Sequence, residues 1–207
     1  MPKCLVLNGH PLHPSFSGSI ADRYGAILSR SGMDIQRLDL SALTIPELAT
    51  RKPAEAEMTG DVARFWDAMT WADHVVIVHP LWWGGMPAKL KALFDIGLQS
   101  GKAYRYRPNN PLPLGLLAGR SVRLIVTSDT PSWFMALGYG NAHFRAMRRQ
   151  VLKFIGLSPV RATHLSVIRH STPQQRARLM ARIDRDARAD LQLLARTRRP
   201  AALAQSL

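Results

Sequence analysis

Short apolar runs alternate with segments of helical periodicity along the chain, and this alternation restricts the fold more than any other feature of the sequence. The runs that predict strands cover residues 3–9, 33–40, 74–79, 120–127 and 160–167. The segments that predict helices cover residues 17–31, 61–71, 87–98, 143–155 and 172–196. Strands that alternate with helices are typical of a parallel sheet with crossover helices on both faces. We therefore predict a three-layer α/β sandwich, in which five parallel strands have the order 2-1-3-4-5.

The length of the chain, 207 residues, is that of one domain or of one domain with a tail. We expect a single domain over residues 1–196 and a C-terminal tail over residues 197–207. Residues 100–119 and 129–141 are predicted to be irregular loops. The single cysteine, Cys4, allows no disulfide within the chain, and no apolar stretch reaches the roughly 18 residues of a membrane span. Because the N-terminus also lacks a signal-peptide core, we expect a cytoplasmic protein without a membrane span.

The positive charge is concentrated in the last third of the sequence. The chain contains 28 Lys and Arg against 14 Asp and Glu, a formal net charge of +14. Residues 1–144 carry 14 basic and 11 acidic side chains, a net charge of +3, whereas residues 145–207 carry 14 basic and 3 acidic ones, a net charge of +11. Such an excess fits an anion-binding surface, but it fits a compositional bias of the source organism equally well. Zinc-ligand spacing and a basic zipper are absent, so we expect no specific nucleic-acid partner.

The first of three unusual loops follows the first predicted strand. It brings Ser15, Ser17 and Ser19 to the start of a helix, where hydroxyls, free backbone N–H groups and the helix dipole suit an anion such as a phosphate. The spacing is neither G-x-G-x-x-G nor G-x-x-x-x-G-K-[ST], so the common dinucleotide and P-loop motifs are missing. The alternative is that Ser17 only caps the helix.

The other two loops also follow predicted strands, and the carboxyl ends of parallel strands meet at one edge of a sheet. In the second loop Trp82 and Trp83 precede two glycines, and an aromatic wall beside a close backbone approach suits a planar heterocycle. Alternatively, one Trp belongs to the core and the loop over residues 100–119 covers the other. The third loop, residues 127–134, offers hydroxyls and amides to the same ring or caps the next element. Together the loops predict a phosphate at the first and a planar ring between the other two.

Three segments carry a family resemblance: NGHP at 8–11 with SFS at 15–17, ADHVVIVHPLWWGGMPAKLKALFD at 72–95, and TSDTPSWF at 127–134. Through them the chain resembles the flavodoxin-like NAD(P)H:quinone oxidoreductase family, whose members bind FMN or FAD. The resemblance implies an enzyme that passes hydride from NAD(P)H through the flavin to a quinone or a similar two-electron acceptor. It implies flavin contacts to the phosphates from His10, Ser15, Phe16 and Ser17, to the isoalloxazine from Pro80, Leu81, Trp82, Trp83 and Gly84, and to its pyrimidine side from Thr127, Ser128, Asp129 and Thr130.

The sequence departs from the family after the fourth predicted strand. Relatives of the mammalian type have a glycine-rich stretch there, followed by a Tyr and a His that assist hydride transfer. An alignment without gaps places Met135 and Asn141 at those positions, and Tyr139 and His143 lie nearby. We therefore assign no catalytic residue. The histidines show no recognised metal-ligand spacing, so we expect no metal site.

Several alternatives stay open at this stage. The sequence does not distinguish FMN from FAD or NADH from NADPH. The family commonly forms homodimers, and the aromatic segment at residues 104–106 is a candidate interface, although it also fits a solvent-covering loop. Within the same fold, the protein fits a regulatory flavoprotein docked on a partner such as a potassium efflux system. From another class, it fits a basic module whose residues 145–199 contact nucleic acid or an anionic membrane surface.

Overall fold

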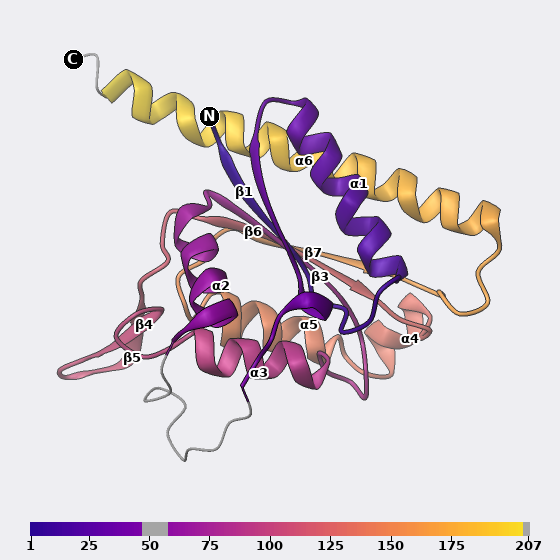
Figure 1. The fold of residues 1–207 in the computed structure, drawn as a ribbon, viewed down its shortest axis with the longest axis horizontal. Coiled ribbons are helices and arrows are strands. Elements are labelled where there is room, and N and C mark those ends of the chain that lie inside the picture. The colour runs from indigo at the N-terminus through magenta and orange to yellow at the C-terminus, as the bar shows by residue number, and fades with distance from the viewer. Residues whose placement is uncertain (47–57, 205–207) are drawn as a thin grey trace.

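A five-stranded parallel sheet forms the centre of the computed structural model, which describes residues 1–46 and 58–204 (Figure 1). Its strands are β1 (Lys3–Asn8), β2 (Asp34–Asp39), β3 (His74–Pro80), β6 (Ser121–Thr127) and β7 (Val160–Leu165). Their order is β2-β1-β3-β6-β7, and every neighbouring pair is parallel. The α/β class and the five parallel strands agree with the prediction. The numbering 2-1-3-4-5 does not hold for the whole chain, because two further strands precede β6.

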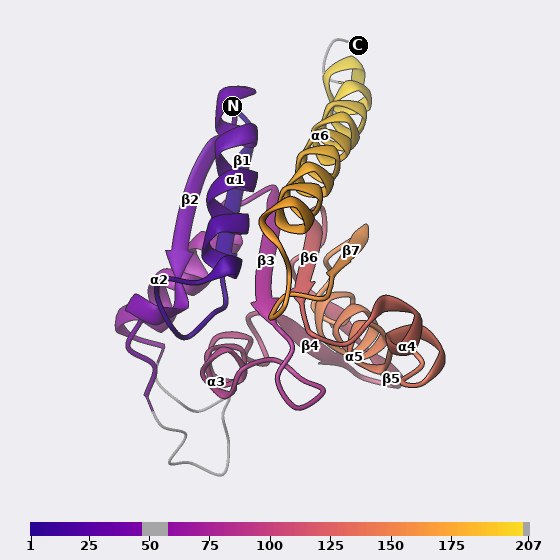
Figure 2. The same cartoon turned by 90° about the vertical axis from the view of Figure 1, so that its right-hand side faces the viewer.

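Helices cover both faces of the sheet (Figures 1 and 2). Helices α1 (Phe16–Arg30) and α6 (Pro173–Ala204) lie on one face. The other face is covered by α2 (Gly60–Trp71), α3 (Ala88–Gly97), α5 (Ala142–Ala146) and the π-helical turn Met147–Leu152 that continues α5. Two short helices complete the described helices, the 3-10 turn Leu40–Ala42 and α4 (Ser132–Leu137).

The alternation of side chains along the strands divides the core into two layers. In β1, Leu5 and Leu7 belong to the cluster under α2 and α3, whereas Cys4 and Val6 belong to the cluster under α1 and α6. Successive residues of a strand point to opposite faces, so a strand that is buried on both faces reads as a continuous apolar run. This is why the sequence of β3, whose seven residues are all buried, contains the unbroken apolar run 75–78.

A buried ion pair fastens α6 to the sheet. Arg123 of β6 donates two hydrogen bonds of 2.8 Å to the carboxylate of Asp190, and Tyr24 of α1 donates its hydroxyl to the same carboxylate. Both members of the pair are buried. Burial alone would raise the pKa of Asp190, but the hydrogen bonds from Arg123 and its positive charge outweigh burial and lower this pKa. The polar cluster therefore fixes where α1 and α6 lie on the sheet.

Residues 100–119 form a hairpin instead of the predicted irregular loop. Strands β4 (Tyr104–Arg107) and β5 (Asn110–Gly115) pair antiparallel and project from the sandwich in Figure 1. Pro111 and Pro113 concealed the strand pattern, but proline is tolerated in a strand with a free edge. Asn109 takes the left-handed conformation that the tight turn requires, with φ of 59°.

The structure corrects two further sequence predictions. The segment 129–141, predicted to be irregular, contains α4. The closing helix was predicted to end at Arg196, ahead of a proline, but α6 continues through that proline to Ala204. A proline inside a helix removes one backbone hydrogen bond without always ending the helix. Residues 205–207 of the predicted tail lie outside the described residues. Among the helices of the described ranges, none is both long enough and apolar enough to cross a membrane.

Candidate functional site

Two adjoining cavities open at the carboxyl ends of the parallel strands. One has a volume of about 440 Å³ and lies among the loops that follow β1, β3, β6 and β7. The other, of about 520 Å³, lies between the β3 and β6 loops and α5. They share Leu81, Ser128 and Asp129 as lining residues. We call the two cavities together the cleft.

All thirteen residues that the sequence indicated line this cleft. The first cavity contains His10, Ser15, Phe16, Ser17, Pro80, Leu81, Trp82, Thr127, Ser128 and Asp129. The second adds Trp83, Gly84 and Thr130. Strands β1, β3 and β6 are neighbours and run in the same direction (Figure 2), so their carboxyl-terminal loops converge although they lie far apart in the sequence.

The start of α1 forms one wall of the cleft. Ser15 is the N-cap, with extended backbone angles, and its Oγ accepts a hydrogen bond of 3.1 Å from the backbone N–H of Gly18. The hydroxyl of Ser17 is therefore not needed as the cap, and it lies 3.4 Å from Oγ1 of Thr127. The first turn of α1 contains no acidic residue. Backbone N–H groups and hydroxyls at such a helix start favour an anion.

His10 connects this wall to the aromatic loop. Its Nδ1 lies 3.1 Å from the backbone nitrogen of Leu12, which donates to it, and its ring packs edge-on against Trp82 at 5.6 Å between centroids. Burial lowers the pKa of His10 below its ordinary value of 6.5. At neutral pH the ring is therefore uncharged, and its contact with Trp82 is that of two aromatic rings.

The loop after β3 is a tight turn that presents Trp83 to solvent. Trp82 and Gly85 exchange two backbone hydrogen bonds of 2.9 Å, and the two residues between them have φ of 51° at Trp83 and 75° at Gly84. Glycine adopts positive φ freely, whereas a bulky aromatic residue does so at a cost of order 1–3 kcal/mol. The Trp83 side chain is 106% exposed, so it is neither part of the core nor covered by the hairpin.

The loop after β6 is tied to the loop after β7. Asp129 accepts a hydrogen bond of 2.7 Å from the backbone N–H of Arg169 and lies 3.3 Å from its guanidinium. Oγ of Ser128 lies 2.7 Å from Nε2 of His164 in β7. Two lining residues that the sequence did not indicate, Ile168 and Arg169, enter the cleft through these contacts. Their position directly after a strand of the same sheet was the signal that could have revealed them.

The far wall of the cleft comes from the segment that departs from the family pattern. Met135, Tyr139, Ala142 and His143 line it, whereas Asn141 is not among the lining residues. Of the two residues that the alignment without gaps places there, Met135 lies on this wall and Asn141 does not, whereas the neighbouring His143 does. Trp133 and Phe134, the last two residues of the third loop, do not line the cleft; Trp133 is exposed on α4.

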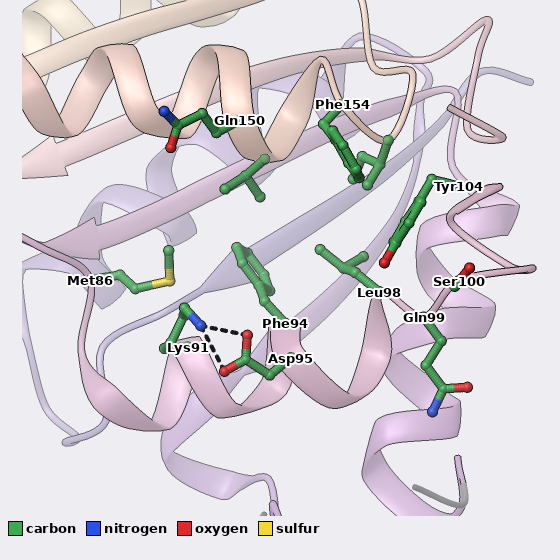
Figure 3. A pocket seen from close by; sticks show the side chains of 12 residues that line it. Met86, Lys91, Phe94, Asp95, Leu98, Gln99, Ser100, Tyr104, Gln150 and Phe154 are labelled. Atoms are coloured by element: carbon green, nitrogen blue, oxygen red, sulfur yellow. Dashed lines mark hydrogen bonds and ion pairs between the residues drawn. The ribbon is translucent and has the colours of Figure 1, made fainter. Parts of the chain in front are cut away.

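A separate cavity of about 330 Å³ lies between α3, the hairpin and the π-helical turn (Figure 3). Aromatic and aliphatic side chains dominate its walls, among them Phe94, Leu98, Tyr104 and Phe154. Its charged members, Lys91 and Asp95, pair with each other along α3 at 2.5 Å. None of the thirteen residues lines this cavity, so the predicted ligand contacts concern the cleft alone. Among the described residues, no group of three or more His, Cys, Asp or Glu is arranged to hold a metal ion.

Comparison with known proteins agrees with this arrangement. A family model described as flavodoxin-like fold matches residues 2–189. The chain belongs to this family. A solved relative, Smu.1420 from Streptococcus mutans, has a TM-score of 0.76 and 30% sequence identity, with 90% of this chain and 99% of that chain covered. This flavodoxin-like family membership confirms the resemblance that the motifs indicated.

Two curated relatives of this chain have names that state an activity. The FMN-dependent NADH:quinone oxidoreductase 1 of Bradyrhizobium diazoefficiens is 31% identical over 178 residues, which are 78% of this chain and 85% of the relative. An NAD(P)H oxidoreductase of Haemophilus influenzae is 28% identical over 128 residues, 59% of this chain. That match spans 62% of the Haemophilus protein's own length.

Proposed function

We propose that this protein is an FMN-dependent NADH:quinone oxidoreductase whose flavin is held in the cleft. The observation that carries the proposal is the convergence of all thirteen expected flavin-binding residues on one edge of the sheet. The name of the Bradyrhizobium relative supports FMN as the flavin, NADH as the donor and a quinone as the acceptor. Each cavity of the cleft also falls within the range of roughly 300–1,000 Å³ that is usual for cofactor sites.

The start of α1 fits the phosphate end of a flavin. The first turn of α1 has no acidic side chain, and the buried Ser17 hydroxyl together with backbone N–H groups offers donors there. The positive end of the helix dipole adds to the attraction of a phosphate. Phe16 supports this wall, because the guanidinium of Arg176 lies 5.5 Å from the centre of its ring.

The β3 and β6 loops fit the ring end. Trp82 and Trp83 supply apolar surface for a planar heterocycle, and the turn at Gly84 leaves backbone groups accessible. When bound, the flavin supplies the chemistry, the reversible acceptance of a hydride. The contribution of this chain is to orient ring and phosphate and to keep one side open for nicotinamide and quinone in turn. A donor on the β6 loop such as the Thr130 hydroxyl would stabilise negative charge that develops on the ring.

The test is the absorption spectrum of the purified protein after supplementation with FMN or FAD, followed by chromatography of the released chromophore. We expect bound FMN that bleaches on addition of NADH and recovers its colour on addition of a benzoquinone. Trp83→Ala should weaken flavin binding without changing the fold, whereas Leu137→Ala, an exposed residue outside the cleft, should leave it unchanged. Absence of bound flavin under these conditions would refute the proposal, and salt-sensitive binding to anionic vesicles or nucleic acid would then favour the basic-module alternative.

We also propose that the functional form is a homodimer in the cytoplasm. The hairpin exposes Tyr106, Leu112 and Leu114 beside the apolar cavity of Figure 3, and a second copy of this chain is the occupant that the family resemblance implies. The single, buried Cys4 is compatible with a reducing compartment. Sedimentation equilibrium should give twice the chain mass for the wild type and a monomer for Leu112→Asp. A monomeric wild type would exclude this part of the proposal.

A further inference from the structure

Two buried histidines meet behind the wall of the cleft. His79 lies in β3 and is fully buried, and His143 lies in α5, 8% exposed, as a lining residue of the cleft. Their Nε2 atoms are 3.3 Å apart, and the rings meet edge to face with 5.1 Å between centroids. None of the flavin contacts proposed above uses this pair.

The hydrogen bonds fix which nitrogens of the pair carry protons. Nδ1 of His79 lies 2.8 Å from the carbonyl oxygen of Pro80, and because a carbonyl only accepts, this Nδ1 must be the donor. A neutral His79 then has an unprotonated Nε2 that accepts. The contact between the two Nε2 atoms therefore requires His143 to donate from its Nε2. A neutral His143 is left with an unprotonated Nδ1.

Burial keeps both rings neutral. It lowers the pKa of His79 to about 3 and that of His143 to about 4, so neither ring is charged at neutral pH. Within the described ranges, the buried side-chain nitrogens without a partner are Nε2 of His74 and Nε of Arg120, and Nδ1 of His143 is not among them. Since this Nδ1 has no hydrogen-bond partner within the same ranges, it is accessible, and the accessible side of His143 is the cleft.

We propose that His79 is a positioning residue that fixes the tautomer of His143, so that Nδ1 of His143 accepts a hydrogen bond from a hydroxyl group of the hydroquinone product in the cleft. Two hydrogen bonds connect the three residues. The carbonyl of Pro80 fixes the proton of His79 on Nδ1, and Nε2 of His79 then fixes the proton of His143 on Nε2, so that Nδ1 of His143 faces the ligand. A partner that fixes the second nitrogen of a functional imidazole also fixes the orientation of its ring. The choice of hydroquinone depends on the proposed function, whereas the tautomer does not.

Nitrogen NMR tests the tautomer directly, with or without flavin. In ¹⁵N-labelled wild-type protein we expect His79 to carry its proton on Nδ1 and His143 to carry its proton on Nε2. A scalar coupling between the two Nε2 nuclei, transmitted across the N–H···N hydrogen bond, should be observed. A proton on Nδ1 of His143, or the absence of this coupling, would overturn the inference even if the protein proved to be an active quinone reductase.

Ligand binding to the FMN-loaded protein tests the consequence. By calorimetry, hydroquinone should bind the wild type roughly 3- to 10-fold more tightly than 1,4-dimethoxybenzene, which has no hydroxyl to donate. His79→Leu should remove this preference, and His79→Gln, whose amide oxygen accepts the same hydrogen bond, should keep it. Both variants must first show wild-type flavin content and thermal midpoints. Equal loss in the two variants would mean that His79 acts only through packing, and it would refute the positioning role.

Discussion

The hydroxyl oxygens of Ser17 and Thr127 lie 3.4 Å apart, although 110 positions separate them in the chain. Ser17 stands at the start of α1 and Thr127 at the end of β6, so the contact joins the helix terminus to the third loop of the cleft. Both side chains are buried. The proposed phosphate and ring ends of the flavin site are therefore held together by the scaffold beneath them.

Removal of the Ser17 hydroxyl should weaken flavin binding. We expect Ser17→Ala to raise the dissociation constant for FMN about 3- to 10-fold, because one hydrogen bond contributes roughly 0.5–1.5 kcal/mol. Ser19→Ala, two residues along the same helix but exposed, is the matched control and should change little. The measurement is fluorescence titration of the apoprotein with FMN. Equal effects of the two substitutions would argue against a ligand at the start of α1.

Loss of the Asp190 charge should destabilise the fold strongly. Asp190→Asn removes the carboxylate charge closest to the buried guanidinium of Arg123 and leaves, among the described residues, only Asp186, 3.7 Å away, opposite it; breaking a buried pair in this way costs about 3–5 kcal/mol. Asp184→Asn, on the same helix, breaks an ion pair with the exposed Arg23 and should change little, because solvent screens exposed pairs. Urea denaturation compares the free energies of unfolding. Similar values for the two variants would contradict a fastening role for Asp190.

Acidification should destabilise the protein at pH values well above those at which its carboxylates become protonated. Burial lowers the pKa of His74 to about 4, that of His79 to about 3 and that of His143 to about 4. The unfolded chain binds these protons as the pH falls through about 6.5, whereas the folded chain does not, so stability is complete above this pH and declines below it. The free energy of unfolding should fall by about 1.4 kcal/mol per pH unit for each histidine.

His79→Gln tests this pH dependence, because it removes one of the three titrating groups. Between about pH 6 and pH 4.5 the slope of the free energy of unfolding against pH should decrease by about 1.4 kcal/mol per pH unit relative to the wild type. Urea denaturation at several pH values gives both slopes. An unchanged slope would mean that His79 does not stay neutral through burial.

The hairpin depends on a close backbone approach at Gly115. A Cβ atom there would lie 2.2 Å from the backbone nitrogen of Gly156 and 2.4 Å from the carbonyl carbon of Ile155, so Gly115→Ala must displace the base of β5. We expect a loss of about 1–3 kcal/mol in unfolding free energy. In Gly25→Ala, the new Cβ meets Val6 and Ile35 at ordinary distances of 3.7 and 3.8 Å, so this variant should be neutral or slightly stabilised. Equal stability of the two variants would contradict the packing described here.

The strands of the central sheet could be predicted from the sequence, because their physical signal is local. A strand such as β3, which is buried on both faces, is an unbroken apolar run over residues 75–78, and no distant residue is needed to recognise it. The hairpin could not be found in this way. Its strands contain prolines and polar residues, and they are held by pairing with each other and by the approach of Gly115 to Gly156, which lies 41 positions further on.

The same distinction between local signals and distant contacts applies to the candidate site. Turn glycines, adjacent tryptophans and a run of serines are local signals, and each follows a strand, so the sequence by itself determined which loops line the cleft. Only the tertiary structure decided which other side chains complete the cleft. Arg169 enters where the loop after β7 bonds to Asp129, and His143 lines the wall in contact with the buried His79. Such contacts depend on the order in which strands and helices lie side by side in space. The local pattern of one segment does not determine that order, because its neighbours in space come from distant parts of the chain.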